Sequence, residues 1–243
     1  MILVVGASGA TGQLLVAQLL ARDLKVRVIV RNLTALAEDL RSHPNLSATE
    51  ASVLELSDNE LQQQVDGCQA VASCLGHNLT FKGVFGPPHR LVTNATRRLC
   101  TAIQASAQQA QESTPVKYVL MNTAGNRNLD CLEPISAKQK FVLSLLRTLL
   151  PPHADNEQAA EFLRAQIGQS HPVIEWAAVR PDNLINTPSV SDYHIHSSPI
   201  RSAIFDAGTT SRINVAHFMA ELITDNALWA RWQGQMPVIY NKN

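Results

Sequence analysis

The chain has 243 residues, 45% of them hydrophobic, and its 20 basic residues balance its 20 acidic ones. No run of five or six basic residues occurs, which argues against nucleic acid or an anionic membrane as a partner. The length is enough for one large hydrophobic core, and no linker or internal repeat divides it. We therefore expect a single domain over residues 1–243.

The start of the chain and its cysteines exclude several other classes. No basic segment precedes the apolar run Ile2–Val5, and the longest later apolar stretch, 141–150, is too short to span a bilayer. We therefore expect a cytoplasmic protein with no membrane partner. The cysteines lack C-x-x-C spacing, which predicts buried free thiols and no metal site. The four cysteines are Cys68, Cys74, Cys100 and Cys131.

Short apolar runs alternate with segments of helical period along the whole chain. Near-continuous hydrophobicity is typical of parallel strands that are buried on both faces. The expected strands are 2–5, 26–30, 46–51, 70–74, 116–121 and 173–179. Helical patterns begin near residue 10 and at Pro88, and two more are expected at about 135–150 and 155–169. This order predicts an α/β fold, a Rossmann-like doubly wound parallel sheet flanked by helices, with a small C-terminal substrate-side extension.

A glycine-rich segment, GASGATG at 6–12, links the first strand to the first helix. Glycines at these spacings permit a sharp turn, a close approach of backbone N–H groups to a pyrophosphate, and tight packing of the helix. The helix N-terminus adds unpaired donors and partial positive charge. The expected phosphate-binding residues are Gly6, Ser8, Gly9, Ala10, Thr11 and Gly12.

The end of the second strand distinguishes between the two nicotinamide dinucleotides. An acidic residue there would bind the ribose 2′-hydroxyl, but the strand runs into Arg31 and Asn32. Arginine can hold a 2′-phosphate through paired hydrogen bonds, so the sequence favours NADP(H) over NAD(H). The alternative is that Arg31 is only a solvated charge at the end of the strand.

Several segments together resemble a known group, the atypical short-chain dehydrogenase/reductases, in the NAD(P)H-binding branch that includes NmrA-like proteins and biliverdin-IXβ/flavin reductases. The resemblance covers nearly the whole chain. The segments that carry it are GASGATG (6–12), VRN (30–32), CLG (74–76), NTAG (122–125), AAEFLR (159–164), VRPDNL (179–184) and TSRINVAHFM (210–219).

The resemblance implies further cofactor contacts beyond the glycine turn. The family often has Asp where Ser52 stands, so the contact with the adenine departs from the family pattern at this point. The implied contacts are Ser52 and Val53 beside the adenine, Cys74, Leu75 and Gly76 along the ribose and nicotinamide, and Pro181 at the start of the loop that crosses toward the substrate.

The catalytic residues also depart from the family pattern. Typical members use Tyr-x-x-x-Lys, and no such pair occurs in this chain, where the alignment puts His153 and Glu157 at the two positions. Thr123 matches the family's active-site serine or threonine, and its neighbour Asn122 either contacts the acceptor or holds the strand-end backbone. The missing pair argues against sugar epimerisation or dehydration and against alcohol oxidation by the usual tyrosine mechanism.

An NADPH-dependent reductase remains consistent with the pattern, because an electron-poor planar acceptor such as a flavin, quinone or tetrapyrrole can take hydride directly. Its small-molecule substrate would bind against residues from about 126–160 and 181–212. The alternative is a non-catalytic sensor of NADP(H) redox state, as NmrA-like members are thought to be. The sequence leaves the oligomeric state open between monomer and homodimer.

Other side chains have more than one interpretation. His153 is either catalytic or part of an exposed turn before a helix that Asp155 caps. His77 either touches bound cofactor or substrate or is a solvated loop residue. His194 and His196 would share one face of a strand, as two metal ligands do, but no further ligands are evident nearby. An apolar stripe within 141–150 indicates core packing, an acceptor pocket or a subunit contact.

Overall fold

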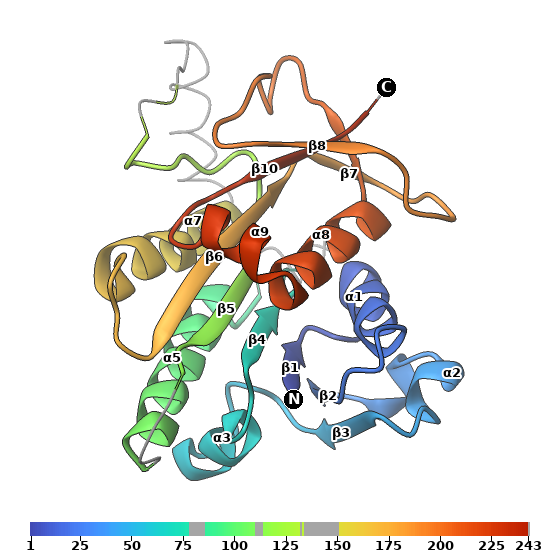
Figure 1. The fold of residues 1–243 in the computed structure, drawn as a ribbon, viewed down its shortest axis with the longest axis vertical. Coiled ribbons are helices and arrows are strands. Elements are labelled where there is room, and N and C mark those ends of the chain that lie inside the picture. The colour runs from blue at the N-terminus through green and yellow to red at the C-terminus, as the bar shows by residue number, and fades with distance from the viewer. Residues whose placement is uncertain (78–85, 110–113, 132, 134–150, 243) are drawn as a thin grey trace.

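The computed structural model describes residues 1–77, 86–109, 114–131, 133 and 151–242. Eight strands form one sheet in the order β3-β2-β1-β4-β5-β6-β10-β8 (Figure 1), with a separate pair β7-β9. All neighbours in the large sheet are parallel except β10 and β8. The predicted doubly wound α/β fold is confirmed. The strands are β1 Ile2–Val5, β2 Val26–Val30, β3 Leu46–Glu50, β4 Ala70–Ser73, β5 Val116–Met121, β6 Ile174–Pro181, β7 Asn183–Ile185, β8 Tyr193–His196, β9 Thr209–Ser211 and β10 Val238–Asn241.

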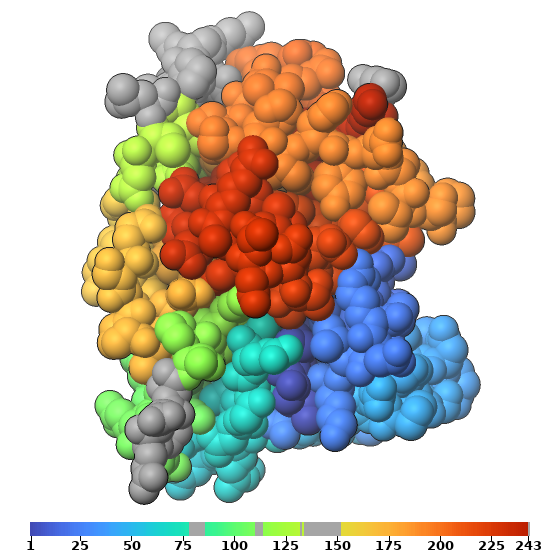
Figure 2. Space-filling model, in the orientation of Figure 1, coloured from blue at the N-terminus to red at the C-terminus, as the bar shows by residue number. Residues whose placement is uncertain are grey.

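Helices cover both faces of the sheet. They are α1 Ala10–Leu20, α2 Glu38–Arg41, α3 Asp58–Val65, α5 Leu91–Gln109, α7 Pro151–Phe162, α8 Arg212–Thr224 and α9 Asn226–Trp232, with a 3-10 turn η1 at Leu33–Ala35 and a π-helical turn η2 at Leu163–Ile167. Helices α3, α5 and α7 lie on one face, and α1 and α8 pack side by side on the other. In Figure 2 the C-terminal residues accordingly lie against the N-terminal ones. Across the described residues, every helix is too short or too polar to traverse a bilayer.

Strand β1 is apolar at every position because both of its faces are buried. Ile2 and Val4 belong to the core under α1 and α8, whereas Leu3 and Val5 belong to the core under α3 and α5. All four side chains have no exposed surface. A central parallel strand buries both of its faces, so alternation of apolar and polar residues would leave polar groups in one core.

The register brings the carboxyl ends of the central strands to one edge. Val5 pairs with Ile29 of β2 and with Ser73 of β4, and Met121 of β5 pairs with Val179 of β6. Residues that follow these strands therefore meet at the edge where doubly wound sheets bind their ligands.

Two expected helix boundaries are wrong. The long helix begins at Leu91 rather than at Pro88. The helix expected from 155 begins at Pro151, a position where proline fits because the first amides of a helix have no intrahelical partner. The helix expected at 135–150, with its apolar stripe, lies outside the described residues.

Candidate functional site

The glycine-rich turn after β1 is held by close backbone contacts. Gly6 has φ +74°, and a Cβ there would lie 2.5 Å from the carbonyl carbon of Cys74 at the end of β4. A Cβ at Gly12 would lie 2.1 Å from the carbonyl oxygen of Gly6. These two glycines are therefore required by packing of the turn itself, whether or not a ligand is bound.

Gly9 has a different environment, which fits a phosphate ligand. Its nearest contact for an added Cβ within 4 Å is the Gly6 carbonyl oxygen at 3.2 Å. Gly9 is the N-cap of α1, where no side chain caps the first turn and no acidic residue lies in it. The first amides of an eleven-residue helix are thus left to bind an anion, and the residues fit the pyrophosphate that the sequence predicts.

Arg31 and Asn32 differ in what their side chains do. Arg31 is exposed directly after β2, and none of the described residues is recorded as a partner of its guanidinium. The Asn32 carboxamide oxygen accepts hydrogen bonds from the backbone N–H and the hydroxyl of Thr34, at 2.8 and 2.7 Å, and so caps η1. Asn32 therefore shapes the loop that presents Arg31.

The predicted adenine-side and ribose-side residues lie at the same edge. Val53 is buried, and its carbonyl accepts a hydrogen bond from Arg98 at 2.9 Å, while the Ser52 carbonyl accepts from Glu55 within the turn after β3. Burial raises the pKa of the Cys74 thiol to about 12, so this thiol stays protonated. Among the described residues, a Cβ at Gly76 would meet nothing within 4 Å, so no packing contact with them requires glycine at this position.

Thr123 and His153 both lie close to Gly125, beyond the end of β5. A Cβ placed on Gly125 would lie 3.4 Å from His153 Cε1, 3.6 Å from Thr123 Oγ1 and 3.9 Å from His153 Nδ1. The hydroxyl and the imidazole therefore flank one point, although thirty residues of sequence separate them. The exposed-turn interpretation of His153 is wrong, because the residue is partly buried inside α7.

The sequence predicts that Asp155 caps the helix that follows His153, but in the structure Asp155 caps a different helix. Its buried carboxylate accepts hydrogen bonds from the backbone N–H groups of Val92 and Thr93, at 2.8 and 2.9 Å, at the start of α5. The Thr93 hydroxyl donates in return to the Asp155 carbonyl at 2.9 Å. Asp155 thus fastens the helix that carries His153 to the N-terminus of α5.

His77 completes this connection from the end of β4. Its Nε2 lies 2.8 Å from Asp155 Oδ2, and its side chain is only 4% exposed. The solvated-loop interpretation of His77 is therefore wrong. Burial raises the pKa of the Asp155 carboxyl, but hydrogen bonds from His77, Thr93 and Val92 outweigh it and the pKa is lowered. The carboxylate is ionised at neutral pH.

Asn122 holds the strand-end backbone, one of its two predicted alternatives. Its Nδ2 donates to the Asn156 carbonyl at 3.0 Å, and its Oδ1 accepts from the Thr123 N–H at 2.8 Å and from Asn126 Nδ2. These bonds connect the end of β5 to α7 and fix the backbone of Thr123.

Sequence reasoning missed the ion pair that organises the substrate-side loops. Arg180, at the end of β6, is fully buried and donates to Glu133 Oε1 at 2.7 Å, to the Asn126 carbonyl at 2.7 Å and to the Ser197 carbonyl at 3.1 Å. The carbonyl of Pro181, the next residue, accepts from the N–H of Ala124 at 2.9 Å. The sequence motif that contains Arg180 could be recognised, but Glu133, the acidic partner of Arg180, lies 47 residues away and has no local sequence signature.

The remaining candidates do not form a site of their own. His194 and His196 lie on strand β8 with ring centroids 6.2 Å apart, and within the described parts of the chain no group of three or more His, Cys, Asp or Glu residues could hold a metal. All four cysteines are free, but Cys131 is partly exposed, so the expectation that all are buried is wrong for it.

A mostly parallel sheet with this strand order and an uncapped glycine turn is typical of Rossmann-fold proteins that bind nicotinamide dinucleotides. The chain belongs to the NAD(P)H-binding family, whose model matches residues 6–226. The resemblance that its motifs suggest is thereby confirmed. No curated protein matches the sequence.

Solved structures share the fold along the whole chain. A short-chain dehydrogenase/reductase from Veillonella parvula, in complex with NADP, has a TM-score of 0.69 at 18% identity, covering 100% of this chain and 94% of the other. ChuY, an anaerobilin reductase from Escherichia coli O157:H7, has 0.66 at 16% identity, covering 100% and 97%. A candidate NADH-flavin reductase from Streptococcus pneumoniae has 0.63 at 15% identity, covering 99% of each.

Proposed function

We propose that this chain is a single-domain, NADPH-dependent reductase that passes hydride to a small planar acceptor of the flavin, quinone or tetrapyrrole kind. The observation that carries the proposal is that Thr123 and His153 both lie close to Gly125, at the sheet edge that also bears the glycine turn. Two neighbours of the same fold are named as reductases of a flavin and of anaerobilin, which supports this acceptor class.

Each residue has a defined task in this proposal. When bound, NADPH would supply a hydride, and an acceptor that takes this hydride gains two electrons and still needs one proton. His153 is the group that gives this proton, since imidazole titrates near neutral pH. The Thr123 hydroxyl orients the acceptor or the carboxamide of the nicotinamide, and Asn122 acts only through the backbone of Thr123. Solvent replenishes the proton on His153.

Replacing His153 with Gln is expected to lower kcat by on the order of a hundredfold, because the nearest proton donor is lost while positioning persists. Replacing Thr123 with Val should lower kcat less and raise KM for the acceptor. Stopped-flow loss of nicotinamide absorbance with flavin and quinone acceptors measures both. His171→Gln is the control, because that histidine pairs with Gln104 away from the site. Unchanged rates in the His153 variant would remove it from the mechanism.

The proposed cofactor is NADPH, with Arg31 on its 2′-phosphate. Arg31→Gln should weaken NADPH binding by about 10- to 100-fold, as expected for loss of a charge-assisted hydrogen bond, and leave NADH binding nearly unchanged. Isothermal titration calorimetry with both cofactors measures the effect. Arg231→Gln, an exposed arginine on α9, is the matched control. Equal losses for both cofactors would assign Arg31 a role other than binding the phosphate.

A redox sensor is the second candidate, favoured by the lack of Tyr-x-x-x-Lys anywhere in the sequence. A sensor needs a cofactor pocket that distinguishes NADP⁺ from NADPH but no proton donor. The two functions differ in turnover. Rapid reduction of any acceptor at the site excludes the sensor, whereas a large affinity difference without turnover supports it.

A further inference from the structure

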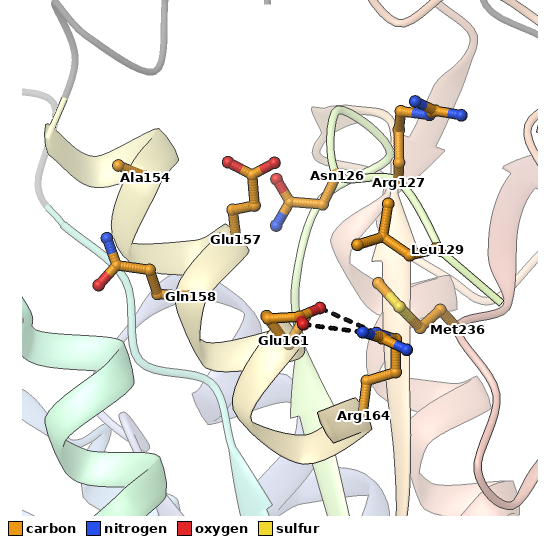
Figure 3. A pocket seen from close by; sticks show the side chains of 10 residues that line it. Asn126, Arg127, Leu129, Ala154, Glu157, Gln158, Glu161, Arg164 and Met236 are labelled. Carbon is orange, nitrogen blue, oxygen red and sulfur yellow. Dashed lines mark hydrogen bonds and ion pairs between the residues drawn. The ribbon is translucent and has the colours of Figure 1, made fainter. Parts of the chain in front are cut away.

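A pocket of about 240 Å³ lies between α7 and the loop that follows β5 (Figure 3). Its lining includes Asn126 and Ala154, which follow Gly125 and His153 in the chain, and extends along α7 to Arg164. Its walls therefore belong largely to the region expected to bind the substrate. The lining residues that carry apolar surface are Leu129, Ala154, Ala160 and Met236.

Two of the charged groups at the pocket, Arg164 and Glu161, are paired with each other. Arg164 donates to both carboxylate oxygens of Glu161 at 2.8 Å and to Asp130 at 2.7 Å. In Figure 3 the Arg127 guanidinium points away from the pocket, and its Nη2 donates to the Glu133 carbonyl at 3.3 Å. Of the two arginines among the described lining residues, Arg164 is thus paired with carboxylates and Arg127 points away, so the pocket suits an uncharged ligand better than an anionic one.

Asn126 gives the pocket a polar anchor. The residue is 1% exposed, and its Nδ2 donates to Asn122, while its Oδ1 is buried and has no hydrogen-bond partner among the residues that the structure describes. The network through Asn122 fixes which end of the amide is the oxygen, because Asn122 Oδ1 accepts and cannot donate. A buried acceptor without a donor is costly, so a ligand O–H or N–H that reaches it gains a hydrogen bond.

The volume of the pocket indicates how much of a ring system its described walls can enclose. A cavity of about 150 Å³ holds one benzene ring. The present pocket therefore suits one or two fused rings, while a flavin has three and a tetrapyrrole has four.

We propose that this pocket binds an uncharged unit of one or two fused aromatic rings, apolar on its faces and bearing a hydroxyl or N–H donor on its edge. The proposal rests on the reductase function proposed above, in which this unit is the acceptor ring. It selects an acceptor of one or two fused rings that itself bears a hydroxyl or N–H donor for Asn126 Oδ1, because an unsubstituted quinone offers only carbonyl acceptors until it is reduced.

Binding of 2-naphthol, which cannot accept hydride, tests the pocket separately from catalysis. Calorimetry on the NADP⁺-loaded protein should show 2-naphthol binding about three- to tenfold more tightly than 2-methoxynaphthalene, which has no donor. Ala154→Phe fills the pocket and should weaken binding at least tenfold, whereas Ala230→Phe on the exposed side of α9 should change it less than twofold. Leu129→Ala, at a side chain that is 59% exposed, provides a second variant with little risk to folding and should also weaken binding.

The outcomes separate the two proposals. No binding to the wild type, or equal binding to the Ala154→Phe and Leu129→Ala variants, overturns the pocket assignment. Tighter binding of biliverdin or FMN, blocked by the same variants, overturns the size argument. Binding that the variants abolish, in a protein that reduces no acceptor, supports the pocket and rejects the reductase.

Discussion

Replacing Arg180 with Met is expected to lower the free energy of unfolding by about 3–5 kcal/mol, because it leaves Glu133 charged and buried without its partner. The two side chains are 0% and 3% exposed and lie 2.7 Å apart. Arg180 also donates to the carbonyls of Asn126, Ser197 and Met236, and these acceptors would lose a charged donor. Urea unfolding followed by circular dichroism measures the difference.

The Arg180 prediction has two controls. Arg201→Met removes an exposed ion pair with Asp206 and should cost less than about 1 kcal/mol. Arg180→Met combined with Glu133→Leu removes both charges and should recover part of the loss, since the buried carboxylate is the main penalty. A single variant within about 1 kcal/mol of the wild type would show that the pair is hydrated or dispensable.

The same pair should also affect the acceptor site. Glu133 Oε2 accepts from the Asn128 N–H at 3.0 Å, and Arg180 Nη1 holds the Asn126 carbonyl, so both ends of the pair support the loop that lines the pocket. Loosening this loop should therefore weaken 2-naphthol binding more than NADP⁺ binding, because the glycine turn lies on β1 and α1.

The sequence predicted the parts of this fold that depend on local pattern. The buried strands were located within two residues, since a parallel strand in the centre of a sheet is continuously apolar, as 26–30 and 116–121 are. The edge strand β8 and its neighbour β10 were not predicted as strands of the main sheet. Their register depends on antiparallel pairing of Tyr193 with Asn241 across 48 residues, which no local pattern encodes.

The candidate site also has some features that the local sequence predicts and others that depend on tertiary packing. The glycine turn and Arg31 could be predicted from the spacing of residues along the chain. The turn depends on local backbone geometry, and Arg31 depends only on a charge placed directly after a strand. The alignment of His153 with the family's tyrosine position stays a prediction, and the burial of His153 within α7 was not foreseen. Asp155 is of a residue type that often caps helices, but only the packing of α7 on α5 shows which helix it caps.

Replacing Asp155 with Ala is expected to lower the free energy of unfolding by about 2–4 kcal/mol at neutral pH, through loss of the cap on α5 and of the partner of His77. Asp155→Asn should lose less, because its amide oxygen can still accept one backbone hydrogen bond. Urea unfolding across a pH series measures both. Asp58→Asn is the control, since that carboxylate is 93% exposed and pairs with Arg98 at the surface.

The pH dependence distinguishes a charged cap from a packing effect. The pKa of Asp155 is lowered in the folded protein, so its contribution is complete above the unfolded value of about 3.9 and is lost as pH falls through the folded pKa. The stability difference between wild type and Asp155→Ala should therefore shrink as the pH falls below about 4. A difference that stays constant into acid would mean that the carboxylate charge contributes nothing, and that Asp155 holds α7 on α5 by shape alone.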